Sequence, residues 1–315
     1  MEMKAQEIFS ELVAITKPAH RGKVWNFRVG EHKSRRIGSG YDIHNIREWQ
    51  QGDPLIHIDL ESSLPTWPKK IYILETIEPK YAPVILVADI SPSIFVQVDE
   101  LKGKFKLMLQ CLGAIGLGAN RLCDPVGILG FSDQIKFYLS PKFGSGWLHY
   151  AYQLLFVEAE KFEKSKCQRK IVPTMTGLNT AIQFLVGRLR RKQCSIVLFS
   201  DFADIICGRT ELEPKTLKIL SALHNWNVIA VMLDDPLEFA WEQKAGVVTV
   251  QDAETGKVEE VRASAAGQIR QEFIERRETL RQQLEKVGVD SVVLSYGDHF
   301  QKLAQFLSER REVSR

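Results

Sequence analysis

The most constraining feature of the sequence is a set of short, uninterrupted apolar runs that alternate with helical patterns from residue 83 onward. The runs are rich in β-branched residues and span residues 83–88, 126–131 and 195–199. A strand that is apolar on both sides must be buried on both faces, as in parallel sheets. Between the runs, apolar residues recur every three or four positions, as in amphipathic helices. This alternation predicts an α/β fold with a doubly wound, mainly parallel, Rossmann-like sheet.

The same patterns divide the chain into parts. Residues 1–82 open with a short helical pattern at residues 8–15 and continue as short alternating runs separated by Gly and Pro. They predict an N-terminal helix followed by a small β-rich subdomain. Residues 83–315 form the predicted α/β domain. An insertion at about residues 236–265 holds two alternating runs around a turn at residues 252–256, which predicts a β-hairpin excursion from the sheet.

Composition limits the class and location of the protein. Its 315 residues carry a formal net charge of only +3, so the chain as a whole is not a nucleic-acid polyelectrolyte. The stretch 107–120 is shorter than the roughly 20 apolar residues of a membrane crossing, and the N-terminus does not resemble a signal peptide. The five cysteines show no CxxC spacing and are expected to be reduced thiols. We therefore predict a cytoplasmic protein.

Polar side chains gather where the predicted strands end. Asp89, Ser91 and Ser93 follow the first buried strand, and Asp201 follows a later one. In doubly wound sheets, ligands bind outside the carboxyl ends of the strands, where these residues would meet. Thr176, in the loop before a predicted helix, would close the site from a third segment. Hard oxygen donors of this kind suit Mg²⁺ or Mn²⁺, so the sequence predicts a magnesium site.

A plainer explanation exists for the same residues. Ser and Asp are favoured as caps at strand–helix junctions, and Asp201 alone could be such a cap. The neighbouring Asp204 is expected to be solvated.

The order D-x-S-x-S, then a Thr, then an Asp resembles the metal-ion-dependent adhesion site (MIDAS) of von Willebrand factor A (vWA) domains. The wider context is closer still to the bacterial DUF58 family of such proteins, over about residues 21–311. The order and spacing of the matching segments are more specific than any one of them. These segments are residues 30–34, 38–40, 46–50, 52–53, 58–59, 124–133, 200–202, 235–238 and 252–256.

The sequence departs from the family pattern at several positions. His57 stands where Arg is common, Leu60 where Trp is frequent, and residues 63–64 replace an Ala-Arg pair. The Thr segment lacks the usual Gly-Thr-Asp pattern, so Thr174 and Thr180 stay open as alternatives to Thr176.

The resemblance implies a non-catalytic protein-interaction module. DUF58 proteins are commonly associated with MoxR-type AAA+ ATPases and are thought to act with them as adaptors or chaperone-like factors. By this resemblance, Ser91, Ser93 and Thr176 would coordinate Mg²⁺, with Asp89 and Asp201 acting directly or through water. An Asp or Glu of the partner, the ATPase or its client, would complete the shell. The sequence has no GxxxxGK[ST] loop, so it would not bind ATP by that device.

Two other classes of function remain as alternatives. The same acids could activate water in a metal-dependent hydrolase, although no general base stands beside them and His57 is distant in sequence. Residues 17–36 hold seven Lys or Arg against one acid, which would suit nucleic-acid binding. We favour a solvated face or a protein-docking patch for that segment, because its aromatic residues Trp25 and Phe27 fit strand packing equally well.

Overall fold

A computed structural model describes residues 37–38, 42–77, 83–96, 103–167, 177–189, 194–222, 227–239, 246–254 and 256–313. The chain divides into two compact units, one spanning residues 31–81 and the other including residues 82–315. The predicted helix at residues 8–15 and the basic segment 17–36 lie outside the described residues.

The larger unit is built on a six-stranded sheet with the order β11-β8-β7-β4-β5-β6. Neighbouring strands run parallel except at one edge, where β6 pairs antiparallel with β5. The uninterrupted apolar runs form the strands that are buried along their whole length. The predicted α/β fold with a mainly parallel sheet is confirmed. The strands are β4 (Val84–Asp89), β5 (Val126–Phe131), β6 (Ile135–Lys142), β7 (Ser195–Ser200), β8 (Asn227–Asp234) and β11 (Asp290–Ser295).

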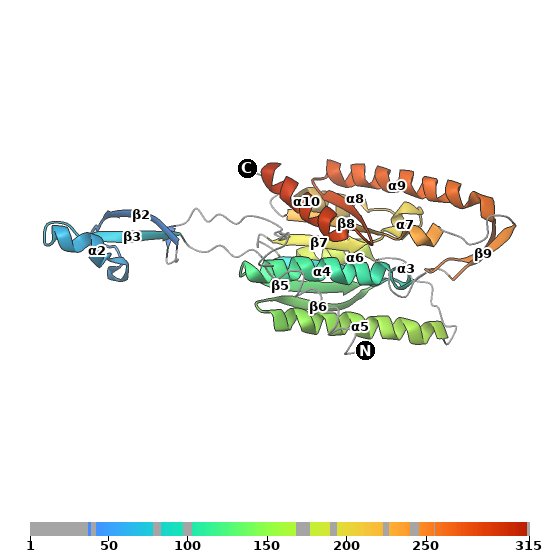
Figure 1. The fold of residues 1–315 in the computed structure, drawn as a ribbon, viewed down its shortest axis with the longest axis horizontal. Coiled ribbons are helices and arrows are strands. Elements are labelled where there is room, and N and C mark those ends of the chain that lie inside the picture. The colour runs from blue at the N-terminus through green and yellow to red at the C-terminus, as the bar shows by residue number, and fades with distance from the viewer. Residues whose placement is uncertain are drawn as a thin grey trace. The chain divides into compact units, whose positions relative to one another are not determined.

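Helices cover both faces of this sheet (Figure 1). Helices α4, α5 and α10 pack on one face, and α6, α8 and α9 pack on the other. Because side chains alternate along a strand, Leu86 of β4 belongs to the first core and Ile85 to the second. The helices of this unit are α3 (Pro92–Phe95), α4 (Lys104–Arg121), α5 (Ser145–Cys167), α6 (Leu178–Arg188), α7 (Ala203–Ile206), α8 (Pro214–Ala222), α9 (Ala266–Lys286) and α10 (His299–Val313), with 3₁₀ turns η3 (Pro236–Phe239) and η4 (Ala263–Ala265).

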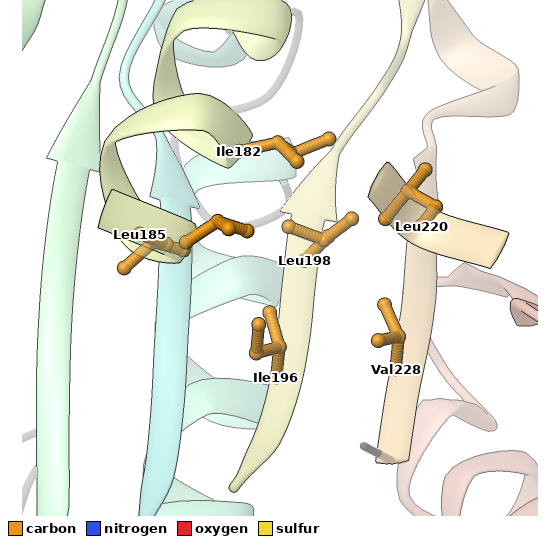
Figure 2. Close-up of a pocket in the computed structure, with 7 residues that line it drawn as sticks. Ile182, Leu185, Ile196, Leu198, Leu220 and Val228 are labelled. Carbon is orange, nitrogen blue, oxygen red and sulfur yellow. The ribbon is translucent and has the colours of Figure 1, made fainter. Parts of the chain in front are cut away.

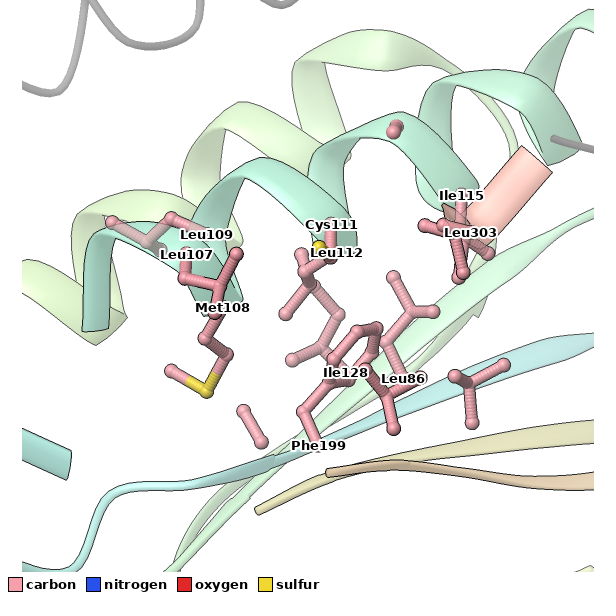
Figure 3. Packing of buried hydrophobic residues seen from close by; sticks show 14 of the residues in the cluster. Leu86, Leu107, Met108, Leu109, Cys111, Leu112, Ile115, Ile128, Phe199 and Leu303 are labelled. Carbon is pink, nitrogen blue, oxygen red and sulfur yellow. The ribbon is translucent and has the colours of Figure 1, made fainter. Parts of the chain in front are cut away.

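The core beneath α4 is closely packed. Gly116 brings this helix against α5, because a Cβ at this position would lie 2.9 Å from a methyl carbon of Leu148. Figure 3 shows side chains of α4, of the strands and of α10 meeting in one cluster. The fully buried members from α4 and the sheet include Leu86, Met108, Leu112, Ile115, Ile128 and Phe199.

A small cavity of about 10 Å³ lies in the opposite core, between α6, α8 and the strands β7 and β8 (Figure 2). Its walls are entirely apolar, so it offers a water molecule no hydrogen-bond partner. It is a packing defect and not a ligand site. The lining residues are Ile182, Leu185, Val186, Ile196, Leu198, Leu220 and Val228.

The smaller unit is a three-stranded antiparallel sheet with the order β1-β3-β2. Short helical turns connect β2 to β3. Among the residues described in this unit, Ile73 is the buried hydrophobic side chain. The elements are β1 (Ile37–Gly38), β2 (Asp42–Glu48), η1 (Leu55–His57), α2 (Leu60–Ser63), η2 (Leu64–Thr66) and β3 (Tyr72–Ile77).

A charged cluster around Arg47 ties this small sheet to the turn after β2. The guanidinium of Arg47 donates two hydrogen bonds to the carboxylate of Asp53, at 2.7 and 2.8 Å, and a third to Glu75 at 2.6 Å. The paired hydrogen bonds from Arg47 lower the pKa of Asp53 to about 2. Charged hydrogen bonds thus order a unit that buries few apolar side chains.

The predicted insertion forms a hairpin, β9 (Val247–Gln251) and β10 (Val258–Arg262), whose strands pair antiparallel. The predicted β-hairpin is therefore confirmed. It forms a two-stranded sheet of its own, separate from the central sheet. In its turn, the carboxylate of Asp252 accepts the backbone N–H of Glu254 at 2.9 Å, an Asx-type turn that fixes the direction of the following residues.

The larger unit contains a buried histidine, His299, whose ring has no hydrogen-bond partner among the described residues. His299 begins α10 and is 5% exposed. Burial lowers the pKa of His299 to about 4, although the charge of Asp298 opposes this. A positive charge is also unfavourable at a helix N-terminus. The imidazole is therefore neutral in the folded protein at neutral pH.

We expect the free energy of unfolding to fall as the pH is lowered from about 6.5 to about 4. In that window the unfolded chain binds a proton at His299 that the folded chain does not bind. The contribution is about 1–2 kcal/mol after allowance for partial solvent screening. Urea unfolding of the wild type and His299→Phe at several pH values measures it. The substitution should flatten the dependence, and equal slopes in the two proteins would contradict this assignment.

Candidate functional site

The candidate site lies where β4 and β7 end at the same edge of the sheet. The two strands are parallel neighbours with Ala88 opposite Phe199, so Asp89 and Ser200 leave the sheet side by side. The hydroxyl of Ser200 donates a hydrogen bond to Asp89 Oδ2 at 2.5 Å. The same hydroxyl oxygen accepts the backbone N–H of Phe202 at 2.9 Å. One serine therefore joins the ends of both strands.

Asp89 also shapes the loop that follows it. Its Oδ1 accepts the backbone N–H of Ser91 at 2.9 Å, and the hydroxyls of Ser91 and Ser93 lie 3.0 Å apart. Ser91 is the N-cap residue of α3, but its side chain makes no capping hydrogen bond. The capping explanation therefore does not account for this hydroxyl. All three side chains are buried.

Asp201 faces this loop from the end of β7. Its Oδ1 accepts the backbone N–H of Ala203 at 3.1 Å, and a hydrogen bond from the Ser93 side chain helps to keep its pKa low. The structure thus brings together four of the five predicted donors, Asp89, Ser91, Ser93 and Asp201, at one buried edge of the sheet.

Of the three candidate threonine ligands, the structure describes Thr180 alone. Thr174 and Thr176 lie outside the described residues, and Thr180 is exposed on α6. Gly177, the next described residue, donates its N–H to the carbonyl of Ser132 after β5. A Cβ on Gly177 would lie 2.5 Å from a backbone oxygen of the same loop, so only glycine fits here. Helix α6 therefore begins against the loop after β5, the parallel neighbour of β4.

A buried lysine joins the site from the first turn of α4, which the sequence did not predict. Lys104 is 4% exposed, and its Nζ lies 2.6 Å from Asp201 Oδ2 and 2.6 Å from Glu238 Oε1. A cation is unfavourable near a helix N-terminus, so these two carboxylates explain its position. Burial would lower the pKa of Lys104, but the charges of both acids raise it. The ammonium group therefore remains charged.

A glutamate from the β9–β10 turn also enters the site. Glu254 is 1% exposed, and its Oε1 accepts the backbone N–H of Ser93 at 2.9 Å. Glu238 and Glu254 both belong to segments that carry the family resemblance, residues 235–238 and 252–256. Their place in these segments was the one sequence feature that singled out Glu238 and Glu254. It did not predict that they lie near Asp201 and Ser93.

The site holds more negative than positive charge. Four acids, Asp89, Asp201, Glu238 and Glu254, lie at the site, and the ammonium of Lys104 pairs with two of them, Asp201 and Glu238. Burial raises the pKa of Asp89 to about 7, and the charge of Asp201 adds to the effect. Burial likewise raises the pKa of Glu254 to about 7. The pKa of Asp201 is lowered, because Lys104 more than offsets its burial. Added positive charge would stabilise this group of acids.

Asp204 departs from its predicted solvated position. It is 1% exposed and pairs with Arg209 at 2.5 Å, because the short helix α7 turns it inward. Arg209 also pairs with Asp252 of the hairpin turn at 2.6 Å. The guanidinium therefore links the segment after Asp201 to the turn that carries Glu254.

The residues present agree with a hard divalent cation in donor chemistry. All the donors are carboxylate or hydroxyl oxygens, and Glu254 Oε2 is buried with no hydrogen-bond partner among the described residues. A cavity of about 250 Å³, lined in part by Ser93, Lys104 and Glu238, leaves room for several waters. No group of three or more His, Cys, Asp or Glu within the described ranges is arranged to hold a metal ion.

A known protein family matches most of this chain. The sequence model described as "Protein of unknown function DUF58" matches residues 45–283. No curated protein matches. A solved aerotolerance-related membrane protein from Bacteroides fragilis NCTC 9343, with multiple mutations to serines, is 13% identical over 72% of this chain and 99% of its own, with a TM-score of 0.36. An uncharacterized membrane spanning protein from Vibrio fischeri is 13% identical over 73% and 99%, with a TM-score of 0.22.

These comparisons correct the predicted location. Both solved proteins are described as membrane proteins, which contradicts the cytoplasmic location predicted from the sequence, and that prediction is wrong. It relied on composition, but a polar domain held at a membrane has the same kind of surface as a free one. In the part of the chain that the structure describes, no helix combines the length and apolar character needed to cross a membrane.

Proposed function

Because the chain belongs to the DUF58 family, whose function is unknown, we propose from its site that it is a metal-dependent protein-interaction module and not an enzyme. In this proposal the larger unit is a vWA-like domain with a MIDAS-type Mg²⁺ or Mn²⁺ site at Asp89, Ser91, Ser93, Thr176 and Asp201. A carboxylate of a partner completes the site. The partner is a MoxR-type AAA+ ATPase or its client, with which the chain acts as an adaptor or chaperone-like factor.

One observation carries the proposal. The side chains of Asp89, Ser91, Ser93 and Asp201 come from two separate strand ends and lie in one connected, buried group. The Ser91 hydroxyl makes no capping hydrogen bond, and the Ser91 and Ser93 hydroxyls, 3.0 Å apart, offer two neutral oxygens next to Asp201. Both oxygens of Asp89 already accept hydrogen bonds, which favours contact with a cation through water for this residue.

The donor set explains why binding is favoured over catalysis. A divalent cation held by hydroxyls and few charged ligands keeps an electrophilic coordination position for an incoming carboxylate. The protein groups would hold the cation, orient the carboxylate and exclude competing water at a buried edge. Lys104 is the competing positive charge, because it already pairs with Asp201.

We expect isothermal titration calorimetry to show Mg²⁺ or Mn²⁺ binding to one site on the full chain. Asp201→Asn, which keeps the size of the side chain, should weaken binding more than about tenfold. Glu278→Gln removes a charge from an exposed position on α9 and should change nothing. If the wild type binds neither ion, the proposal fails.

The partner is tested separately. Pull-down of a MoxR-type ATPase from the same genome should require Mg²⁺ and should be lost in EDTA. The ATPase itself uses Mg²⁺, so the more informative comparison is Asp89→Ala against the wild type at constant Mg²⁺. Circular dichroism checks that the variant is folded. Unchanged retention in both EDTA and Asp89→Ala would contradict a metal bridge.

A further inference from the structure

The turn of the β9–β10 hairpin carries a buried carboxyl group into the candidate site. Glu254 is 161 residues from Ser93 in the sequence, yet its Oε1 accepts the backbone N–H of Ser93 at 2.9 Å. We propose that Glu254 is the chain's own carboxylate ligand of this cation site. It fills the position that a partner carboxylate would take, and the inference rests on the proposed function of the site.

The second carboxylate oxygen is the main observation. Glu254 Oε2 is buried and has no hydrogen-bond partner among the described residues, and the whole residue is 1% exposed. An unpartnered carboxylate oxygen removed from water costs free energy, so such an atom in a native structure indicates a missing partner. A cation beside Ser93 would supply that partner.

The basic side chains near Glu254 are already engaged. Lys104 pairs with both Asp201 and Glu238, and Arg209 pairs with both Asp204 and Asp252. Each of these two cations therefore contacts two carboxylates other than Glu254. The excess of acid groups around the cavity is the condition under which a divalent cation binds favourably.

The turn is built to hold Glu254 in this position. The Asp252 carboxylate accepts the backbone N–H of Glu254 at 2.9 Å, and Arg209, from the segment after α7, donates a hydrogen bond to Asp252 at 2.6 Å. The contact with Ser93 is thus supported by two further polar contacts on the same turn. A partner carboxylate that entered the site would have to displace Glu254 first, so the resting chain would bind its partner more weakly than a chain without this carboxylate.

The test compares Mn²⁺ binding to full-length variants by calorimetry. Glu254→Gln keeps an oxygen that accepts the Ser93 N–H but removes the charge, and it should weaken Mn²⁺ binding about tenfold or more. Glu260→Gln removes the same charge from an exposed position on β10 and should bind Mn²⁺ like the wild type. Glu254→Asp, which keeps the charge on a shorter side chain, should bind more tightly than Glu254→Gln.

Hydrogen exchange separates a ligand from a structural residue. Mg²⁺ should slow amide exchange in residues 246–262 of the wild type and of Glu260→Gln, but not of Glu254→Gln. If Asp201→Asn loses Mn²⁺ binding while Glu254→Gln binds as tightly as the wild type, this inference is wrong and the proposed function stands. If the wild type binds no Mn²⁺, both fail. Glu254→Asp binding no better than Glu254→Gln would also contradict the assignment.

Discussion

Lys104→Met is expected to lower the free energy of unfolding by about 3–5 kcal/mol, because it leaves buried carboxylates without their cation. Lys104 Nζ lies 2.6 Å from both Asp201 and Glu238, and the lysine and Asp201 side chains are each 4% exposed. Methionine has a similar volume, so lost packing contributes little. Urea unfolding followed by circular dichroism measures the difference.

Lys106→Met is the matched control, since it removes the same charge from the same helix. Lys106 is only partly buried and lies 5.9 Å from the ring centroid of Tyr296, so its loss should cost less than about 1 kcal/mol. Asp201→Asn combined with Lys104→Met should recover part of the stability. Equal costs for Lys104→Met and Lys106→Met would show that the buried pair contributes nothing.

Magnesium adds a second comparison to this variant. If the site accepts a divalent cation, millimolar Mg²⁺ should stabilise Lys104→Met more than the wild type, because the ion replaces the missing positive charge in the folded state alone. A stabilisation that is equal in the two proteins would show that Mg²⁺ and Lys104 do not share a site.

Leu112→Ala is expected to cost about 2–5 kcal/mol, with a large decrease in the urea midpoint. Leu112 is fully buried between α4 and the central sheet, in the cluster shown in Figure 3. The cost has two parts, the loss of apolar burial and the cavity that rigid neighbours leave open.

Arg121→Ala provides the control for that substitution. Arg121 is the exposed last residue of α4, so its replacement should change the stability by no more than about 0.5 kcal/mol. A loss below about 1 kcal/mol for Leu112→Ala would contradict the close packing described here.

The fold was predicted well where a local pattern determines burial. The apolar runs 84–88, 126–131 and 195–199, which make up nearly all of β4, β5 and β7, lack charged side chains, and such strands are stable only between two helical layers. The hairpin was predicted from its alternation and its turn. The pairing of Arg47 with Glu75 was not predicted, since it joins positions 28 residues apart through the register of two strands.

In the candidate site too, local sequence patterns predicted some residues, whereas contacts between distant segments determine others. Asp89, Ser91, Ser93 and Asp201 could be found because parallel strands place their carboxyl ends at one edge. Lys104 could not, because a lysine in an amphipathic helix pattern normally faces solvent, and its contact with Asp201 spans 97 residues. Glu254 sits in a polar turn, where an exposed acid is the ordinary expectation. Its burial depends on how the hairpin packs, which no local pattern encodes.

The double pairing of Arg209 has a consequence for any movement of the hairpin. Asp204 is a buried residue of α7, whereas Asp252 belongs to the hairpin turn. If the turn moved away, Arg209 would keep its ion pair with Asp204, and its guanidinium group would stay near the position that Asp252 had left. When the hairpin returned, Asp252 would meet a guanidinium group that is already oriented to pair with it. The hairpin could therefore detach and rebind reversibly.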